Sequence, residues 1–311
     1  MASIPVIRLA PHSPAARARP AFQGRALPVL AVGVVLVLLW YGLAVLLNGH
    51  SAEQQVLAPL NKPWTWSDWL LATWSAPRPV LPAPHQIAIT LWQGLFDWPF
   101  DSPRSLLLQT WITAQATLLG FVLGGLLGWV LAALMVHART PERALMPWVV
   151  ASQTVPVLAL APIVLIILGS MGLSGLLPKA VIAMYLCFFP VTVAMVQGLR
   201  APQRIETELL QTYAASRWQT FWLLRMPSAL PYVFPALKVA VAAGLVGAMV
   251  AEVSTGAQGG LGARLLTASY YGNILQMWAA LVMAALLGLG LTAAVAVLER
   301  VVLRKRGGRV Q

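Results

Sequence analysis

The sequence predicts an all-α integral membrane protein with six transmembrane helices. Hydrophobic residues make up 59% of the 311 residues and charged residues only 10%, a balance too apolar for the surface of a soluble domain. Six separate segments reach the roughly 20 apolar residues that a helix needs to cross about 30 Å of hydrocarbon. Because an unpaired backbone amide in lipid costs several kcal/mol, each of these segments is expected to be helical.

The six predicted spans follow the apolar segments of the chain. They cover residues 26–47, 111–136, 144–169, 178–199, 228–251 and 274–298. Away from the span ends, only the fifth span carries a charge, Lys238. We expect this lysine to have a structural role, with its long side chain able to reach the interface. The first span is longer than the apolar core of a signal peptide and lacks a clear cleavage site, so it is predicted to stay uncleaved.

Basic residues lie mostly on one side of the predicted spans. Six crossings place both termini on one side, which holds 15 basic residues, while the other side holds four; Lys179 and Lys238, in or beside spans, complete the 21. Because cytoplasmic segments retain positive charge, both termini are predicted to be cytoplasmic, in the inner (plasma) membrane of a bacterial cell. Residues 1–25 and 304–311 would be cytoplasmic tails, and residues 48–110 an extracytoplasmic segment.

The extracytoplasmic segment is rich in Trp and Pro and has one stretch with helical periodicity. Ile87, Leu91 and Leu95 recur every four residues, so residues 85–96 are predicted to form either a short helix lying on the membrane interface or an irregular loop. Residues 48–80 either dock a binding protein or sit on the membrane, where Trp is common at headgroup level.

Several classes of function are excluded by the residues that the sequence lacks. The single cysteine, Cys187, rules out an intramolecular disulfide, and the four histidines have no ligand spacing, so no metal site is predicted. Basic residues lie between apolar segments, which argues against nucleic acid as a partner. None of the four lysines follows a glycine, so the P-loop pattern is absent and another chain would have to bind ATP. We predict no catalytic residue and no cofactor bound by this chain.

The longest internal cytoplasmic segment, residues 200–227, is predicted to contain a short amphipathic helix. Ile205, Leu209 and Tyr213 recur at every fourth position, and polar residues occupy the other face. This helix is too polar to span a membrane and too short to fold alone. It therefore needs a partner surface.

The same segment resembles the EAA loop of ABC importer permeases, in which E-A-A is followed after three residues by G and, nine residues later, by I-x-L-P. The matching positions are Glu208, Leu209, Leu210, Ala214, Leu224, Met226 and Pro227. Leucines replace the two alanines, and Ala214 replaces the glycine at the position of a sharp turn.

Further elements are similar to the nitrate, taurine, sulfonate and pyrimidine-precursor branch of that family, over roughly residues 80 to 305. They are Leu81-Pro82-Ala83-Pro84, Pro156 with Ala161-Pro162 and Gly169, Phe189-Pro190, Ala251-Glu252, Gly259-Gly260-Leu261-Gly262 and Leu298-Glu299-Arg300. The resemblance implies a type I ABC importer permease architecture with a cytoplasmic coupling helix. Residues 111–303 would form the permease core, and the first span would brace it.

The resemblance also implies a function and a set of partners. The chain would form the solute path and couple it to ATP hydrolysis by separate ATPase subunits, which would hold the ATP and Mg. A second copy or a related permease and an extracytoplasmic solute-binding protein would complete the importer. The expected solute is nitrate, a sulfonate such as taurine, or a pyrimidine precursor.

Polar residues within the spans are the candidates for the solute path. Ser152, Gln153 and Thr154 lie next to Pro156 and either contact solute or pack helices and satisfy backbone groups freed by proline. Glu252 ends the fifth span and either lines the path, forms a gate or caps the interface. Small residues in the second span are expected to allow close helix packing; they are Gly120, Gly124, Gly125 and Gly128.

Two other classes of function serve as alternatives. A secondary transporter driven by an ion gradient usually shows inverted repeats and charge pairs inside the membrane, and the sequence shows neither. A non-transporting scaffold would have no reason to carry a helix with the EAA spacing.

Overall fold

The computed structural model describes residues 26–60, 63–137, 139–255 and 259–305, and over these residues it contains helices and no strands. The α-helices are α1 (Ala26–Ala52), α2 (Trp66–Ser75), α3 (Pro84–Phe96), α4 (Leu106–His137), α5 (Arg139–Ala151), α6 (Val157–Ser170), α7 (Leu176–Leu199), α8 (Arg204–Thr212), α9 (Arg217–Thr220), α10 (Met226–Thr255), α11 (Leu261–Tyr270) and α12 (Ile274–Lys305). Short 3-10 or π turns extend them at Glu53–Leu57, Ala58–Leu60, Ser152–Thr154 and Phe221–Arg225.

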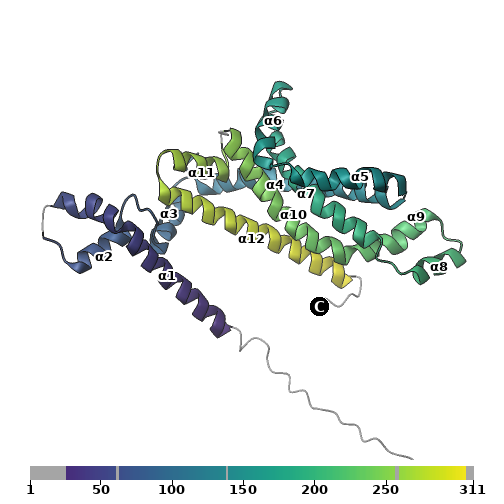
Figure 1. Ribbon diagram of the computed structural model, residues 1–311, viewed down its shortest axis with the longest axis horizontal. Helices are drawn as coiled ribbons and strands as arrows, with labels where there is room; N and C mark the ends of the chain where they lie inside the picture. The colour runs from purple at the N-terminus through teal and green to yellow at the C-terminus, as the bar shows by residue number, and fades with distance from the viewer. Residues whose placement is uncertain (1–25, 61–62, 138, 256–258, 306–311) are drawn as a thin grey trace, which may run out of the picture.

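Five of the described helices are long and apolar enough to cross a membrane, and a bent pair can form a sixth span. The five predicted spans other than the third lie within α1, α4, α7, α10 and α12, which extend further than expected. The bundle that they form is elongated along these helices (Figure 1).

The third predicted span, 144–169, is wrong as a single helix. The chain turns by 103° between residues 140–154 and 157–170, and α6 projects away from the bundle (Figure 1). The break lies at Val155, which is extended (φ −78°, ψ 120°), and Pro156. A residue that precedes proline is disfavoured in the helical region, and proline has no N–H to continue the hydrogen-bond ladder.

The centre of the bundle is the close packing of α4 and α10 on α7. A Cβ added at Gly120 or Gly128 of α4 would lie 2.4 Å from Ala183 Cβ or 2.8 Å from Phe188 O, both on α7. Gly124 makes an equally close approach, so the packing predicted for these three glycines is confirmed. Gly125 faces open space instead, with nothing within 4 Å.

Helix α10 also approaches α7 through its own glycines, next to α4. A Cβ at Gly244 would lie 2.6 Å from Cys187 Sγ, and one at Gly247 would lie 3.0 Å from Ala183 Cα. In the contacts between α4 and α7, residue numbers rise in the same direction on both helices. In the contacts between α10 and α7, the numbers rise on one helix as they fall on the other. Helices α4 and α7 are therefore parallel, and α10 is antiparallel to both.

Lys238, the charge within the fifth predicted span, pairs with α12. Its Nζ atom lies 2.5 Å from Oε2 of Glu299, and the two side chains are 32% and 17% exposed. This contact agrees with the structural role expected for Lys238. It also joins two antiparallel spans far apart in sequence.

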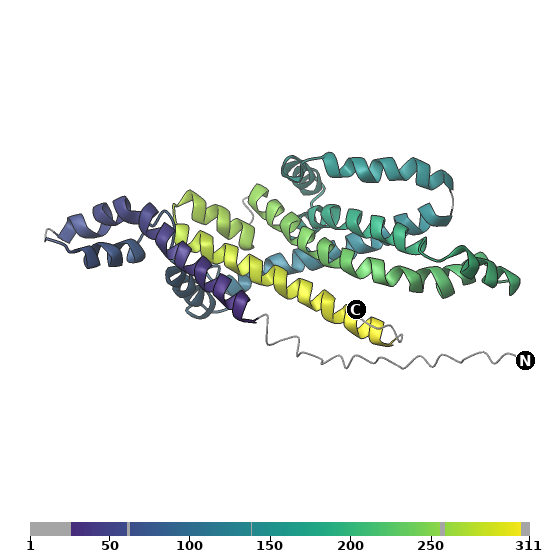
Figure 2. The same ribbon diagram turned by 60° about the horizontal axis from the view of Figure 1, so that its bottom comes forward.

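Helix α1 diverges from the bundle along its first half (Figure 1), although its ribbon overlaps that of α12 in the view of Figure 2. The large apolar side chains from Leu27 to Leu39 are exposed. Contact begins at Trp40, whose Nε1–H donates to Pro82 O at 3.0 Å and whose ring centroid lies 5.2 Å from that of Trp278. The first span therefore contacts the bundle through its second half.

The segment after α1 is organised around a buried asparagine that sequence reasoning missed. Asn48 Nδ2 donates to Thr73 O at 3.1 Å and to Leu81 O at 2.8 Å, while Oδ1 accepts from the backbone N–H of Val80 and Leu81 at 2.8 and 3.0 Å. These four bonds use both N–H donors and both oxygen lone pairs of the side-chain amide. They fix the loop before α3 against the end of α1.

Residues 85–96 are helical, as part of α3, but their apolar face does not lie on an open surface. Ile87 is buried, and Leu91 and Leu95 pack on a core cluster formed by Leu106 and by residues of α11 and α12. The helix alternative for residues 85–96 is therefore confirmed, and its position at the membrane interface stays a prediction. A four-residue period identifies a covered face and does not say whether lipid or protein covers it.

Candidate coupling segment and outer polar cluster

Helix α8 presents an apolar face that no described residue covers. The side chains of Ile205, Leu209 and Tyr213 are 70%, 57% and 77% exposed, and no residue of α8 is buried. The helix begins with a capping box in which Gln203 N–H donates to Glu206 Oε2 at 2.8 Å. The amphipathic helix predicted from the sequence is confirmed as an element, with its apolar stripe facing outward.

The sharp turn expected after this helix is present although alanine replaces glycine. Ala214 has φ 54°, the one positive φ among the described residues other than glycine. Its N–H donates to Gln211 O at 2.9 Å, and the N–H of Ala215 donates to Leu210 O at 3.0 Å. This hydrogen-bond pair is a Schellman motif, which normally has glycine at its left-handed position.

A single helical rod follows the turn. Ser216 caps α9 in a second capping box, in which Gln219 N–H donates to Ser216 Oγ at 3.2 Å. The rod then passes through a π turn, Phe221–Arg225, into α10. Pro227 is the second residue of α10, a position in the first turn where the missing N–H of proline costs little. The turn at Ala214 therefore connects α8 to a transmembrane helix through one rigid element.

The structure divides the predicted coupling residues between these two elements. Glu208, Leu209 and Leu210 lie on α8, while Leu224, Met226 and Pro227 lie at the π turn and the start of α10, where they are half-buried. Met226 packs against a core cluster that includes Phe221 and Ala229.

Glu208 has a partner within its own helix. Its Oε1 atom accepts from Arg204 Nε at 2.7 Å, and the two side chains are 53% and 91% exposed. An exposed pair four residues apart on a helix contributes only about 0.3–0.5 kcal/mol. Glu208 can therefore exchange Arg204 for another basic group at little cost.

At the other end of the bundle, Glu252 lies in a buried polar cluster that joins several helices. Both carboxylate oxygens lie 3.0 Å from Thr113 Oγ1 on α4, and Oε2 accepts from Gly262 N–H at 2.9 Å. Lys179 Nζ on α7 lies 3.5 Å from Oε1 and donates to Gly259 O at 2.8 Å. Glu252 has no exposed surface and Lys179 is 7% exposed.

Glycines make room for this cluster. Gly260 has φ +115°, and a Cβ there would lie 2.1 Å from the carboxylate carbon of Glu252. A Cβ at Gly262 would lie 2.5 Å from Met249 O. Gln109 of α4 completes the cluster by accepting from Gly260 N–H at 2.5 Å. The sequence Gly259-Gly260-Leu261-Gly262 is therefore fitted around the carboxylate.

The fold pairs charges that lie in or beside the predicted spans. Glu252, a candidate for the solute path, has no exposed surface here, and its place in that path stays a prediction. The fold brings Lys179 to Glu252 and Lys238 to Glu299. The partners are on different helices, so spacing along the chain does not reveal them.

The three polar residues of the third predicted span lie at its bend. Ser152 Oγ donates to Val149 O at 2.7 Å, Thr154 Oγ1 donates to Ala151 O at 2.8 Å, and Gln153 is exposed. The hydroxyl of Tyr185 on α7 donates to Ser152 O. Ser152 and Thr154 thus bond carbonyl groups close to the break, and both Gln153 and Thr154 are exposed.

An outer cavity lies beside the buried cluster and was missed by sequence reasoning. Its volume is about 560 Å³, and its polar lining includes Gln115, Ser174 and Lys179, with Gly259 at its edge. Gln115 is a polar residue within an apolar span, a signal that the sequence did contain. Among the described residues, no group of three His, Cys, Asp or Glu is placed to hold a metal ion.

Comparison with known proteins gives one consistent result. Residues 124–306 match the family described as binding-protein-dependent transport system inner membrane component. The chain is 40% identical over 144 residues to the formylaminopyrimidine transport permease protein ThiX of Halalkalibacterium halodurans, covering 46% of this chain and 56% of that protein.

Two further relatives align over most of the chain. The riboflavin transport system permease protein RibX of Chloroflexus aurantiacus is 31% identical over 242 residues, covering 76% of this chain and 86% of that protein. The putative aliphatic sulfonates transport permease protein SsuC of Bacillus subtilis is 26% identical over 227 residues, covering 73% and 78%.

Proposed function

This chain belongs to the family of inner-membrane components of binding-protein-dependent transport systems, the permease subunits of ABC importers, and we propose that α8 is the element through which it responds to ATP. In this proposal the apolar face of α8 docks in a groove on a separate ATPase subunit. Movement of the ATPase pair is then transmitted through the turn at Ala214 to the rod of α9 and α10.

The observation that carries the proposal is the combination of an uncovered face and a rigid connection. Ile205, Leu209 and Tyr213 form an apolar stripe that is costly to leave in water. The hydrogen bonds at Ala214 and the cap at Ser216 leave no flexible linker between α8 and α9. A force on α8 therefore reaches α10, which holds Lys238 and Glu252.

The partners of the complete importer follow from the same proposal. Two ATPase subunits would bind ATP and Mg on the cytoplasmic side, together with both termini, and a solute-binding protein would deliver solute on the other side. A second permease copy or a related permease would enclose the path. Helix α6 supports this arrangement, since it projects from the bundle and exposes Leu158, Ile163 and Ile166.

We place the solute path at the outer cavity beside Lys179, with Gln153 at the bend as a second contact. The cavity offers an amide from Gln115 and a hydroxyl from Ser174 among apolar side chains, the mixed lining typical of sites for small organic solutes. Among the expected solutes, a pyrimidine precursor is supported best, because the relative with 40% identity is named for formylaminopyrimidine.

The coupling proposal is tested by co-purification of an ATPase subunit with the full chain. The variant Ile205→Ser/Leu209→Ser removes the apolar stripe, and Thr212→Ala changes an exposed polar residue of the same helix as the control. We expect wild type and Thr212→Ala to co-purify with the ATPase subunit. The double variant should recover at least tenfold less of it. Equal recovery with all three proteins would show that α8 is not the contact.

The solute assignment is tested separately, in proteoliposomes that contain the permease, its ATPase and its binding protein. We expect uptake of formylaminopyrimidine that depends on ATP, and no uptake of nitrate or taurine. A Gln115→Leu variant should reduce that uptake while leaving ATPase recovery unchanged. Uptake of nitrate or taurine alone would overturn the assignment and leave the permease function intact.

A further inference from the structure

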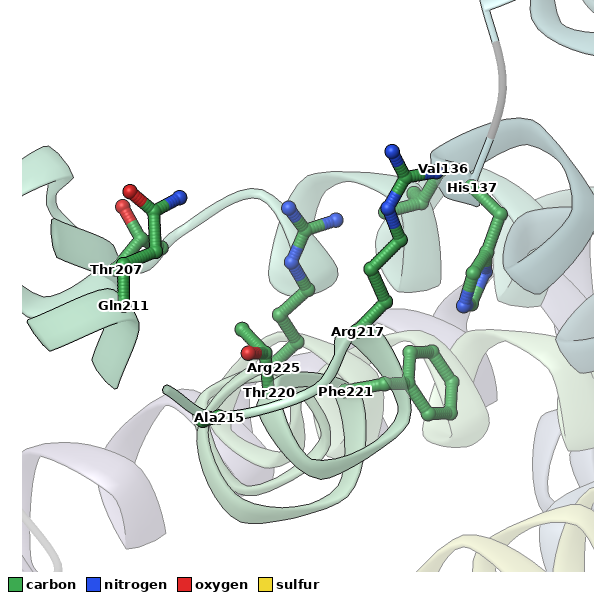
Figure 3. A pocket seen from close by; sticks show the side chains of 9 residues that line it. All are labelled: Val136, His137, Thr207, Gln211, Ala215, Arg217, Thr220, Phe221 and Arg225. Atoms are coloured by element: carbon green, nitrogen blue, oxygen red, sulfur yellow. The ribbon is translucent and has the colours of Figure 1, made fainter. Parts of the chain in front are cut away.

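A polar cleft lies behind α8, on the side away from its apolar stripe. Its volume is about 360 Å³, and it separates α8 from the end of α4 (Figure 3). Thr207 and Gln211 of α8 form one wall, and Val136 and His137 of α4 form the other. The rod that begins at α9 forms the floor, from which two arginines rise.

The two arginines give the cleft a strong positive charge. Arg217 and Arg225 extend side by side from the rod toward the same opening, between the wall of α8 and the wall of α4 (Figure 3). Among the described residues, neither makes an ion pair, and none of the lining residues is acidic. The adjoining acid, Glu142, lies 2.5 Å from Arg200 and is thus already paired.

The remaining polar groups show which hydrogen bonds are open to a ligand. The hydroxyls of Thr207 and Thr220 donate to carbonyls of their own helices at 2.7 and 3.1 Å. His137 Nδ1–H donates to Ala133 O at 2.7 Å, which leaves the Nε2 atom. The Gln211 amide makes no hydrogen bond within the described residues. Two guanidinium groups and one amide are therefore open to donate to a ligand, and the Nε2 atom of a neutral His137 is open as an acceptor.

We propose that this cleft binds a phosphate group, carried either by a small phosphate compound or by the headgroup of a membrane lipid. The planar guanidinium of arginine fits phosphate oxygens in pairs, and two such groups at one opening can neutralise a dianion. A cleft of this volume admits a phosphate with a small substituent. A bound phosphate would connect α8 to α4 and so restrict the movement of the coupling segment.

The test measures phosphate binding by the full chain in nanodiscs. Binding of inorganic phosphate is titrated in nanodiscs of phosphatidylcholine alone, and retention of phosphatidylglycerol is measured by native mass spectrometry from nanodiscs of mixed composition. The variant Arg217→Gln/Arg225→Gln is compared with Arg300→Gln/Arg304→Gln, which removes two exposed arginines of α12 outside the cleft.

We expect at least one probe to bind wild type and the α12 variant equally, and to bind the cleft variant at least tenfold more weakly. Binding of inorganic phosphate identifies a soluble ligand, and binding of phosphatidylglycerol alone identifies a lipid; both support phosphate chemistry. The proposal is overturned if neither probe binds, or if the two variants lose affinity equally, which would indicate unspecific attraction.

A second variant separates charge from geometry and guards against misfolding. Arg217→Lys/Arg225→Lys keeps both charges but removes the paired N–H donors. We expect it to fold as wild type and to bind the probe with an affinity between those of wild type and the glutamine variant. Full affinity in the lysine variant would contradict the proposed contact through guanidinium groups.

Discussion

Ala214 has a left-handed backbone conformation that costs an alanine roughly 1–2 kcal/mol and a glycine nothing in steric terms. We expect Ala214→Gly to stabilise the turn by about 1 kcal/mol, because the relief of strain outweighs the added freedom of the unfolded chain. Hydrogen exchange at the amides of residues 214 and 215 measures this change directly.

The neighbouring alanine supplies the control for that prediction. Ala215 takes part in the same motif but has no positive φ, so Ala215→Gly should weaken the turn. Ala214→Val should weaken it more, since a branched side chain is least tolerated in this conformation. Equal exchange in Ala214→Gly and wild type would show that the turn carries no strain.

Gly260 combines a positive φ with direct contact to the Glu252 carboxylate. We expect Gly260→Ala to lower the free energy of unfolding by about 3 kcal/mol or more, because the Cβ must displace a buried charged group. Thermal unfolding of the detergent-solubilised chain measures the loss. Gly272→Ala is the matched control, since Gly272 has φ +62° but nothing within 4 Å, and it should cost only about 1 kcal/mol.

At the scale of an element, the second half of α1 contacts its neighbours through Trp40, Tyr41 and Asn48. We expect Trp40→Ala to release the middle of α1, because it removes both the tilted ring contact with Trp278 and the hydrogen bond to Pro82 O. The two contacts together contribute about 2 kcal/mol. Faster hydrogen exchange in residues 80–85 would report the release.

The exposed half of the same helix provides the comparison. Leu36 is 60% exposed and belongs to the part of α1 that stands apart from the bundle, so Leu36→Ala should leave exchange in residues 80–85 unchanged. If Leu36→Ala and Trp40→Ala had the same effect, insertion of α1 rather than its docking would set the stability of the outer segment.

Elements also differ in how far the sequence predicted them. The apolar segments gave five spans correctly, because the length of hydrocarbon imposes a minimum on any helix that crosses it. The third span bends at Pro156, and the bounds of such a break depend on Tyr185 and on the neighbouring helices as much as on the proline. Helix α3 was predicted from its period, and the structure adds that Leu91 and Leu95 on that face pack on the core.

At the scale of the whole molecule, the spans are joined by charge pairs whose members lie far apart in the chain. We expect Lys238→Met to destabilise the bundle by about 2 kcal/mol, since it leaves Glu299 unpaired within the spans. The partial exposure of both side chains keeps this figure below that of a fully buried pair. Thermal unfolding in detergent gives the measurement.

The double variant distinguishes a pair from two independent residues. Lys238→Met/Glu299→Leu removes both charges, so it should recover most of the stability lost by Lys238→Met alone. If the losses of the two single variants simply added in the double variant, the 2.5 Å contact between these residues would contribute nothing to stability.

The sequence by itself determined that the chain lies in a membrane, the number of apolar segments and the position of the amphipathic helix α8. These properties depend on local composition and on the spacing of apolar residues. The thickness of the bilayer sets the length of a span, and the geometry of a helix sets the spacing of its apolar face. The spacing around Glu208 also indicated the family, and the comparisons then confirmed it.

Only the tertiary structure decided which residues meet. Three features bring together residues from separate segments: the cluster of Lys179, Thr113 and Glu252, the cleft lined by Arg217 and Arg225, and the burial of Asn48. Packing of α4 and α10 on α7 sets those distances, because glycines let the backbones approach until side chains on three helices share one space. The sequence shows which polar and charged side chains are present, but only the fold determines which of them become partners.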